Sequence, residues 1–179
     1  LLAGTASTGL FRCVNGRFQH VPSGAGMDAS RVNAVRLDGE GRVWVCGDRG
    51  VYIDPGDGLF THVSPVDLNV FDVVSNGDTA WLATDKGLYQ LDTRTLPWRM
   101  TKEALLPAVL MTSMKRDTQG NLWIGSESHG LYRLNNRRVD SLGIADGLSS
   151  AAVEQVLLDA YQNIWLGTRR GIDMLELDV

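Results

Sequence analysis

The sequence is poor in cysteine and in long apolar runs, and each shortage excludes a class of protein. It has two cysteines among 179 residues, Cys13 and Cys46, which are too few for a disulfide scaffold or a zinc site. We expect both to be small buried hydrophobic residues, with a disulfide between neighbouring sheets as the alternative. The longest apolar stretch, Ala104 to Met111, is broken by Pro107 and is too short to span a bilayer.

Charge is not concentrated anywhere along the chain. There are 17 Lys and Arg against 21 Asp and Glu, a formal net charge of −4, and the basic residues form no block. This excludes the electrostatic footprint of a nucleic-acid-binding protein and direct contact of this chain with an anionic membrane. An initiator Met and a signal peptide are missing, so we expect an N-terminus that has been trimmed or processed.

What the sequence does contain is an internal repeat of about forty residues. Its tryptophans at 44, 81, 123 and 165 are separated by 37, 42 and 42 residues, and 42 residues before Trp44 stands Leu2, in a degenerate first copy. A glycine followed by an apolar residue comes six or seven residues after each of these positions. The repeated residues are Trp44, Trp81, Trp123 and Trp165, with Gly50, Gly87, Gly130 and Gly171.

Each copy is expected to form four short strands. In the second copy these are Val32 to Leu37, Arg42 to Cys46, Val51 to Asp54 and Leu59 to Val63. A turn, Asp38-Gly39-Glu40-Gly41, separates the first two strands, and no segment shows a long helical period. Four antiparallel strands in every forty residues, with Trp on the second, are typical of a β-propeller blade. The predicted fold class is therefore all-β, a β-propeller.

The blades of a propeller stack face to face, so both faces of each sheet are covered. We therefore interpret the four repeated tryptophans as packing between blades, with stacking on a sugar as the alternative. Trp98 falls outside the repeat, on an outer strand or its connection. It is the Trp that we expect to be exposed.

One copy resembles a known family. The segments Asp146-Gly147-Leu148-Ser149-Ser150, Val153 to Leu158 and Asp159 to Thr168 are similar to the two-component regulator propeller repeat. That repeat runs GL-S-x-x-V, an apolar strand, D-x-x-G-N-x-W-I-G-T, then G-L and a further apolar strand. The copies around Trp123 and Trp44 follow it well, whereas Asn76-Gly77-Asp78-Thr79 shortens the turn in the copy around Trp81.

The resemblance implies a place in signalling. Members of that family typically form the extracytoplasmic sensor region of bacterial membrane-bound histidine kinases or hybrid kinases, and some carry a diguanylate cyclase. Several sense oligosaccharides, and the complete sensors usually form seven-bladed rings. The implied localisation is periplasmic, in an inner-membrane protein. Nothing in this chain resembles a kinase, a phospho-acceptor domain or a transmembrane helix.

The strand pattern gives eighteen strands, which is about four and a half blades. We expect a fragment of a larger, seven-bladed type of propeller, whose partners are other propeller repeats of the same receptor. On its own, the fragment is expected either to form a homodimer through its open ends or to close with strained geometry. The predicted single domain, 1–179, divides into blades at 1–31, 32–69, 70–108, 109–151 and 152–179, the first and last of them partial.

Signals for catalysis are weak. His20, His62 and His129 lie in different copies without metal-like spacing, and we expect them to be partly exposed on the rim. There is no Gly-x-Ser-x-Gly elbow, Walker loop or HExxH helix, so we expect no enzyme activity in this domain, no cofactor and no metal. The first-turn aspartates Asp38, Asp117 and Asp159 are expected to cap their own turns.

The loops between second and third strands vary in charge and size between fixed scaffold residues. In a propeller they share a face with the connections from each outer strand to the next inner strand, and varied loops on a rigid scaffold often recognise ligands. The alternative is that they are ordinary solvated turns. The candidate residues, which could meet a small molecule or an oligosaccharide, are Asp48, Arg49, Asp85, Lys86, Glu127, His129, Arg169 and Arg170.

Three functions are compatible with these observations. The first is a ligand-sensing, non-catalytic propeller domain of a bacterial signal-transduction receptor. The second is a protein-interaction scaffold that uses the same face or the rim. The third is a propeller lyase or hydrolase, which ordinarily needs a convergent His/Glu or metal set that the sequence does not display.

Overall fold

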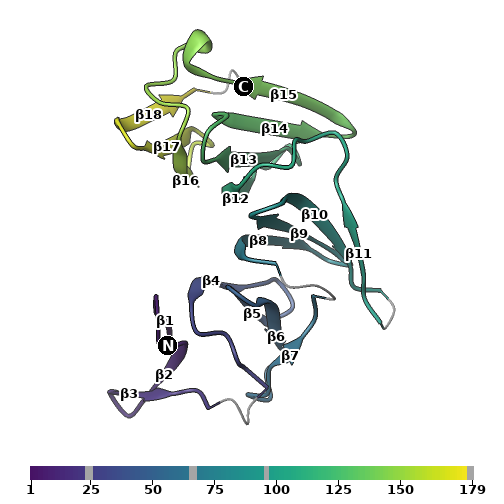
Figure 1. The fold of residues 1–179 in the computed structure, drawn as a ribbon, viewed down its shortest axis with the longest axis vertical. Coiled ribbons are helices and arrows are strands. Elements are labelled where there is room, and N and C mark those ends of the chain that lie inside the picture. Colours follow the sequence, from purple (N-terminus) through teal and green to yellow (C-terminus); the bar gives the residue numbers. More distant parts are fainter. Residues whose placement is uncertain (23–25, 65–67, 95–96, 177–179) are drawn as a thin grey trace. The chain divides into compact units, whose positions relative to one another are not determined.

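The computed structural model describes residues 1–22, 26–64, 68–94 and 97–176. Within these ranges the chain forms eighteen β-strands in five antiparallel sheets, one short 3-10 helix at Ile144–Asp146, and no α-helix (Figure 1). None of its described helical segments has the length and apolar character needed to cross a bilayer. The predicted all-β propeller architecture is confirmed.

Consecutive strands pair within each sheet, in chain order. Sheet 1 comprises β1 (Leu2–Gly4), β2 (Leu10–Val14) and β3 (Arg17–His20). Sheet 2 comprises β4 (Val32–Leu37), β5 (Val43–Gly47), β6 (Gly50–Asp54) and β7 (Thr61–His62). Sheet 3 comprises β8 (Val70–Asn76), β9 (Thr79–Thr84), β10 (Gly87–Asp92) and β11 (Arg99–Lys102). Sheet 4 comprises β12 (Met111–Arg116), β13 (Leu122–Ser126), β14 (Leu131–Asn135) and β15 (Arg138–Leu142), and sheet 5 comprises β16 (Val153–Leu158), β17 (Ile164–Thr168) and β18 (Gly171–Leu175).

The predicted strands agree closely with the observed ones, with one exception. The first strand of the second copy was expected at Val32 to Leu37, where β4 lies. The fourth strand was expected at Leu59 to Val63, but β7 contains only Thr61–His62. The preceding turn extends further than expected because the Asp54 carboxylate accepts backbone N–H groups of Gly56 and Gly58, at 2.7 and 2.9 Å.

The chain forms two compact units, one of Leu1–Leu82 with Tyr89–Thr101 and one of Ala83–Leu88 with Lys102–Val179. In the first unit, the buried Trp44 packs on Val70, Val73 and Leu82 of sheet 3. In the second unit, the buried Trp123 packs on residues of sheet 5, among them Val156, Ile164 and Leu166. Packing between sheets, as predicted for the repeated tryptophans, is confirmed for these two.

A carboxylate in the first turn holds each long copy of the repeat together. Asp117 Oδ1 accepts the backbone N–H groups of Gln119 and Asn121, at 3.0 and 2.8 Å. Its Oδ2 accepts the side-chain amide of Asn121 at 2.6 Å and the indole Nε1–H of Trp123 at 2.8 Å. One side chain thus closes the turn and fixes the orientation of the tryptophan on the next strand.

The same arrangement occurs in two other copies. Asp38 accepts the indole N–H of Trp44 at 2.7 Å, and Asp159 accepts that of Trp165 at 3.0 Å. Both carboxylates also accept backbone N–H groups of their own turns. The predicted turn-capping role of these aspartates is confirmed, and the bond to Trp extends it.

The expectation for Trp98 was wrong. Its ring is half-buried and stacks on Trp44, with ring centroids 6.2 Å apart and planes 26° apart. Trp165, by contrast, is 39% exposed. Sequence position alone did not show that Trp98 stacks on Trp44.

We predict that Asp117→Ala destabilises the protein by about 2–3 kcal/mol, because buried donors lose a charged acceptor. Asp159→Ala removes the same bonds where Trp165 is more exposed to water, so its effect should be smaller. Urea denaturation of the two variants and the wild type measures the difference. Equal losses for both variants would contradict a role that depends on burial.

The turn aspartates should also make stability depend on pH. Burial by itself raises the pKa of Asp117, but hydrogen bonds from Asn121 and Trp123 outweigh it and leave the pKa below its usual value. A carboxyl group with a lowered folded-state pKa contributes stability above its unfolded pKa, near 4, and loses that contribution as the pH falls. We predict that the free energy of unfolding drops between about pH 5 and pH 3, and drops less in Asp117→Asn. Identical pH profiles would contradict this.

Candidate functional site

Loops and connections meet at the end of each sheet opposite the aspartate turns. In three sheets, the first residue of the loop after the second strand donates its backbone N–H to the carbonyl of the residue before the first strand. The pairs are Asp48 with Arg31 at 3.2 Å, Glu127 with Leu110 at 3.1 Å, and Arg169 with Ala152 at 3.3 Å. Three of the predicted binding residues therefore belong to loops that are fixed by backbone hydrogen bonds.

The first strands carry a further tie at this end. Strands β4, β12 and β16 have a register shift near their second residue, as a β-bulge produces. The side chain of Asn33 in β4 donates to the carbonyl of Val70, and that of Thr112 in β12 donates to the carbonyl of Val153, at 2.7 and 2.6 Å. Each bond joins one sheet to the start of the next, which gives the loops a rigid base.

In the first unit, a pocket of about 270 Å³ lies where the loop after β1 meets the connection between β3 and β4. Both segments were predicted to belong to the loop-bearing face. Hydroxyl groups, one imidazole and one carboxylate share the pocket with apolar side chains. The lining residues are Ser7, Thr8, Leu10, His20, Val21, Met27, Asp28, Ala29 and Ser30.

Asp28 connects the pocket to the neighbouring sheet. Its carboxylate accepts a hydrogen bond from the Tyr52 hydroxyl of β6 and lies 3.3 Å from Arg49 Nη1. The bond from Tyr52, together with Arg49, lowers the pKa of Asp28, while burial and the Asp28 charge raise the pKa of Tyr52. Asp28 is therefore a carboxylate and Tyr52 a neutral donor at neutral pH.

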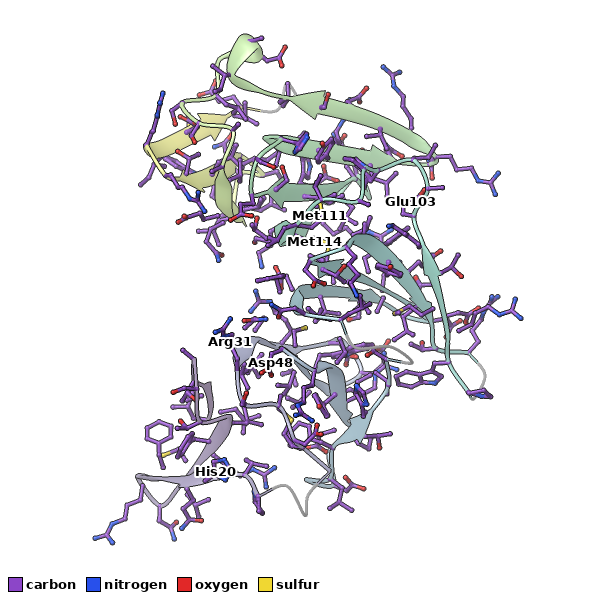
Figure 2. All side chains as sticks on the ribbon, viewed as in Figure 1. His20, Arg31, Asp48, Glu103, Met111 and Met114 are labelled. Carbon is purple, nitrogen blue, oxygen red and sulfur yellow. The ribbon has the colours of Figure 1, made fainter. Side chains whose placement is uncertain are left out.

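Asp48 holds the end of the same connection. It accepts the Ser30 hydroxyl at 2.6 Å and the backbone N–H of Arg31 at 3.1 Å. Burial raises the pKa of Asp48, but these hydrogen bonds outweigh it and the pKa is lowered. Figure 2 shows Asp48 beside Arg31, at the start of β4. Two predicted binding residues, Asp48 and Arg49, thus each contact a residue that lines the pocket.

The histidines of the first unit pack on aromatic rings. His20 lies edge-on to Phe11, with ring centroids 5.2 Å apart, and His62 stacks on Tyr52 at 4.8 Å. His62 Nε2 also lies 3.3 Å from the Ser64 hydroxyl. Both histidines are exposed, as expected, and His20 in addition faces the pocket.

The other predicted binding residues lie in the second unit. Arg169 joins Glu127 of sheet 4 to Glu154 of sheet 5, at 3.1 and 3.2 Å. His129 Nδ1 lies 2.9 Å from the Ser128 hydroxyl. The remaining three, Asp85, Lys86 and Arg170, are exposed on their loops.

Sequence reasoning missed the tie between Asp28 and Tyr52, although a signal for it exists. Asp28 stands four residues before β4, and Tyr52 stands two residues after Gly50. The corresponding residues of sheet 5, Ser149 and Asp173, are also bonded, with the Ser149 hydroxyl and N–H at 3.0 and 2.9 Å from the carboxylate. The two copies differ in chemistry but share the contact.

Both cysteines are free; Cys46 is buried in the core of the first unit and Cys13 is half-buried. The packing interpretation thus holds for Cys46, and the disulfide alternative is not observed. Across the described residues, no three His, Cys, Asp or Glu side chains are grouped as metal ligands.

Comparison with known proteins agrees with this geometry. The family model of the two component regulator propeller matches residues 105–128, which contain the buried turn of Asp117 and Trp123. Over these residues the chain is similar to the repeat of that family. The resemblance inferred from the sequence is thereby confirmed. No curated protein matches the chain.

Solved structures share the propeller fold. The extracellular domain of BT4673 from B. thetaiotaomicron, described as a one component or a hybrid two component system, matches 97% of this chain and 25% of its own length, at 19% identity and a TM-score of 0.81. The extracellular domain of BT3049 from B. thetaiotaomicron, described as a hybrid two component system, matches 96% and 26%, at 22% identity and a TM-score of 0.72. PorZ, a surface component of the type-IX secretion system of Porphyromonas gingivalis, matches 97% and 30%, at 15% identity and a TM-score of 0.71. The chain spans about a quarter of the length of the first two.

We predict that Tyr52→Phe loosens the connection before β4, because Asp28 loses its donor. Hydrogen exchange at the backbone amides of residues 27–30 should become faster, while the melting temperature falls by only a few degrees. Tyr132→Phe, which removes a hydroxyl from the corresponding position of sheet 4, is the control. Unchanged exchange in Tyr52→Phe would show that Asp28 does not hold this connection.

Proposed function

We propose that this chain is a ligand-recognising, non-catalytic part of the extracytoplasmic sensor of a bacterial membrane-bound signalling receptor. The family repeat at residues 105–128 and the fold shared with extracellular domains of two component systems support the signalling context. The pocket of the first unit carries the recognition part of the proposal. The pocket is lined by the loop after β1 and by the connection between β3 and β4, and hydrogen bonds fix the backbone of both segments.

The chemistry of the pocket suits a small polar ligand or one end of an oligosaccharide. Thr8 and Ser7 offer hydroxyl groups, which both donate and accept, and Asp28 offers a charged acceptor. Leu10, Val21 and Met27, which are almost fully buried, line the pocket with apolar side chains. A volume of about 270 Å³ is at the small end for ligand pockets, which favours a ligand the size of one sugar ring.

The loops of the second unit offer a complementary set of groups. The guanidinium of Arg170 is exposed, and within the described ranges no ion pair of this side chain is formed. Arg169, in contrast, is already bonded to Glu127 and Glu154, so a ligand would have to displace one of these carboxylates. For this reason we place the primary contacts at the pocket, with Asp48 and Arg49 supporting it.

A thermal-shift screen with neutral disaccharides, uronic-acid and sulfated disaccharides, and small carboxylates tests the proposal. We expect at least one class to raise the melting temperature, and His20→Ala or Thr8→Val to weaken its binding about tenfold or more, measured by titration calorimetry. His129→Ala, an exposed histidine on a loop of the second unit, should bind as the wild type does. If no class raises the melting temperature, or His129→Ala alone weakens binding, the pocket is not the site.

A further inference from the structure

The outer edge of sheet 4 is a strand that uses only half of its backbone hydrogen-bonding groups. In each four-stranded sheet the fourth strand pairs with the third strand alone, so β7, β11 and β15 all lie at an edge (Figure 1). This edge follows from the order of strands within one repeat. With five residues β15 is the longest of the three, compared with two residues in β7 and four in β11.

Strand register shows which backbone groups of β15 point outward. A two-residue turn joins β14 to β15, so Asn135 and Arg138 form a hydrogen-bonded pair, and such pairs then alternate along the ladder. The backbone groups of Arg138 and Asp140 therefore bond to β14. The N–H and C=O groups of Val139 and Ser141 point away from the sheet, and they have no backbone partner among the described residues.

The turn that leads into β15 carries an arginine where glycine is favoured. Both turn residues have a positive φ, 42° at Asn136 and 71° at Arg137, as a type I′ turn requires. The hairpin of sheet 1 has the same turn, and there a glycine, Gly16, takes the second position with a φ of 77°. An arginine held in this conformation is strained, and strain of this kind is concentrated at binding and active sites.

Positive charge gathers at this turn. The side chains of Arg137 and Arg138 are exposed, that of Arg138 to 81%, and Arg133 lies on the neighbouring strand. One carboxylate, that of Asp140, pairs with both Arg133 and Arg138. The side chain of Arg137 forms no ion pair or hydrogen bond within the part of the chain that the structure describes. The edge of β15 thus begins with an excess of positive charge.

We propose that this edge binds an extended, acidic segment of a partner protein, which adds to sheet 4 as a fifth strand beside β15. The backbone of the segment bonds to Val139 and Ser141, and its carboxylates pair with Arg137 and Arg138. A basic segment can make the same backbone bonds, but an acidic one gains in addition from the charges at the turn. This interaction is independent of a ligand in the pocket of the first unit.

Fluorescence anisotropy of a labelled short peptide of alternating glutamate and valine residues tests the proposal. The wild type should bind this peptide about tenfold or more tightly than a peptide of alternating lysine and valine. Val139→Pro should weaken binding about tenfold or more, because proline removes an outward N–H group and leaves the ladder with β14 intact. Arg138→Glu should weaken binding as much, whereas Arg99→Glu, on the edge strand β11, is the matched control and should bind as the wild type does.

Hydrogen exchange shows where the peptide binds. Exchange at the amides of Val139 and Ser141 should slow when the peptide is added, while exchange at Arg138 and Asp140 should be slow with or without it. Ser141→Pro replaces Val139→Pro if circular dichroism shows that the first variant is unfolded. No binding of the acidic peptide, equal binding of the basic one, or undiminished binding by a folded proline variant overturns the proposal. Binding to vesicles that contain phosphatidylserine, without binding of the peptide, also overturns it, because the charged turn would then serve a membrane.

Discussion

The carboxylate of the first turn is the constraint on which each long copy of the repeat depends. Asp117 accepts two backbone N–H groups of its turn, an amide of Asn121 and the indole of Trp123. The turn conformation, the exit direction of the second strand and the orientation of the tryptophan are thus set by one side chain. The tryptophan then packs on the following sheet, so a local turn determines how sheets stack.

The opposite ends of the strands are fixed differently. There the loops are held by backbone hydrogen bonds from Asp48, Glu127 and Arg169 and by side-chain hydrogen bonds from Asn33 and Thr112. Most of these bonds do not depend on which side chains the loops carry. Side chains in these loops can therefore change from copy to copy while the backbone stays in place. This division, with chemistry repeated between copies at one end of the sheet and varied chemistry at the other, is what a recognition scaffold requires.

Sequence reasoning predicted what is local and periodic. The regular spacing of Trp44, Trp81, Trp123 and Trp165 predicted the repeat. The turns were predicted from their aspartates, because a turn depends on residues within a few positions of one another. The repeat length could also have indicated contacts between neighbouring copies. Arg169 bonds to Glu127, which lies 42 residues earlier, close to the length of one repeat. The sequence alone did not indicate that Trp98 stacks on Trp44, because Trp98 lies outside the repeat. The pocket was not predicted as such, since Thr8, His20 and Asp28 come together only through the path of a connection that has no period.

If the turn aspartates fix the repeated tryptophans, the exchange of the indole protons with water reports on it directly. In an NMR spectrum, exchange of the indole Nε1–H with water should be slowest for Trp44 and Trp123, which are buried and bonded to Asp38 and Asp117. It should be faster for Trp165, which keeps the bond but is exposed, and for Trp81, whose copy has the shortened turn. Equal exchange rates at all four positions, or slowest exchange at Trp81, would show that the turn aspartates do not fix the tryptophans.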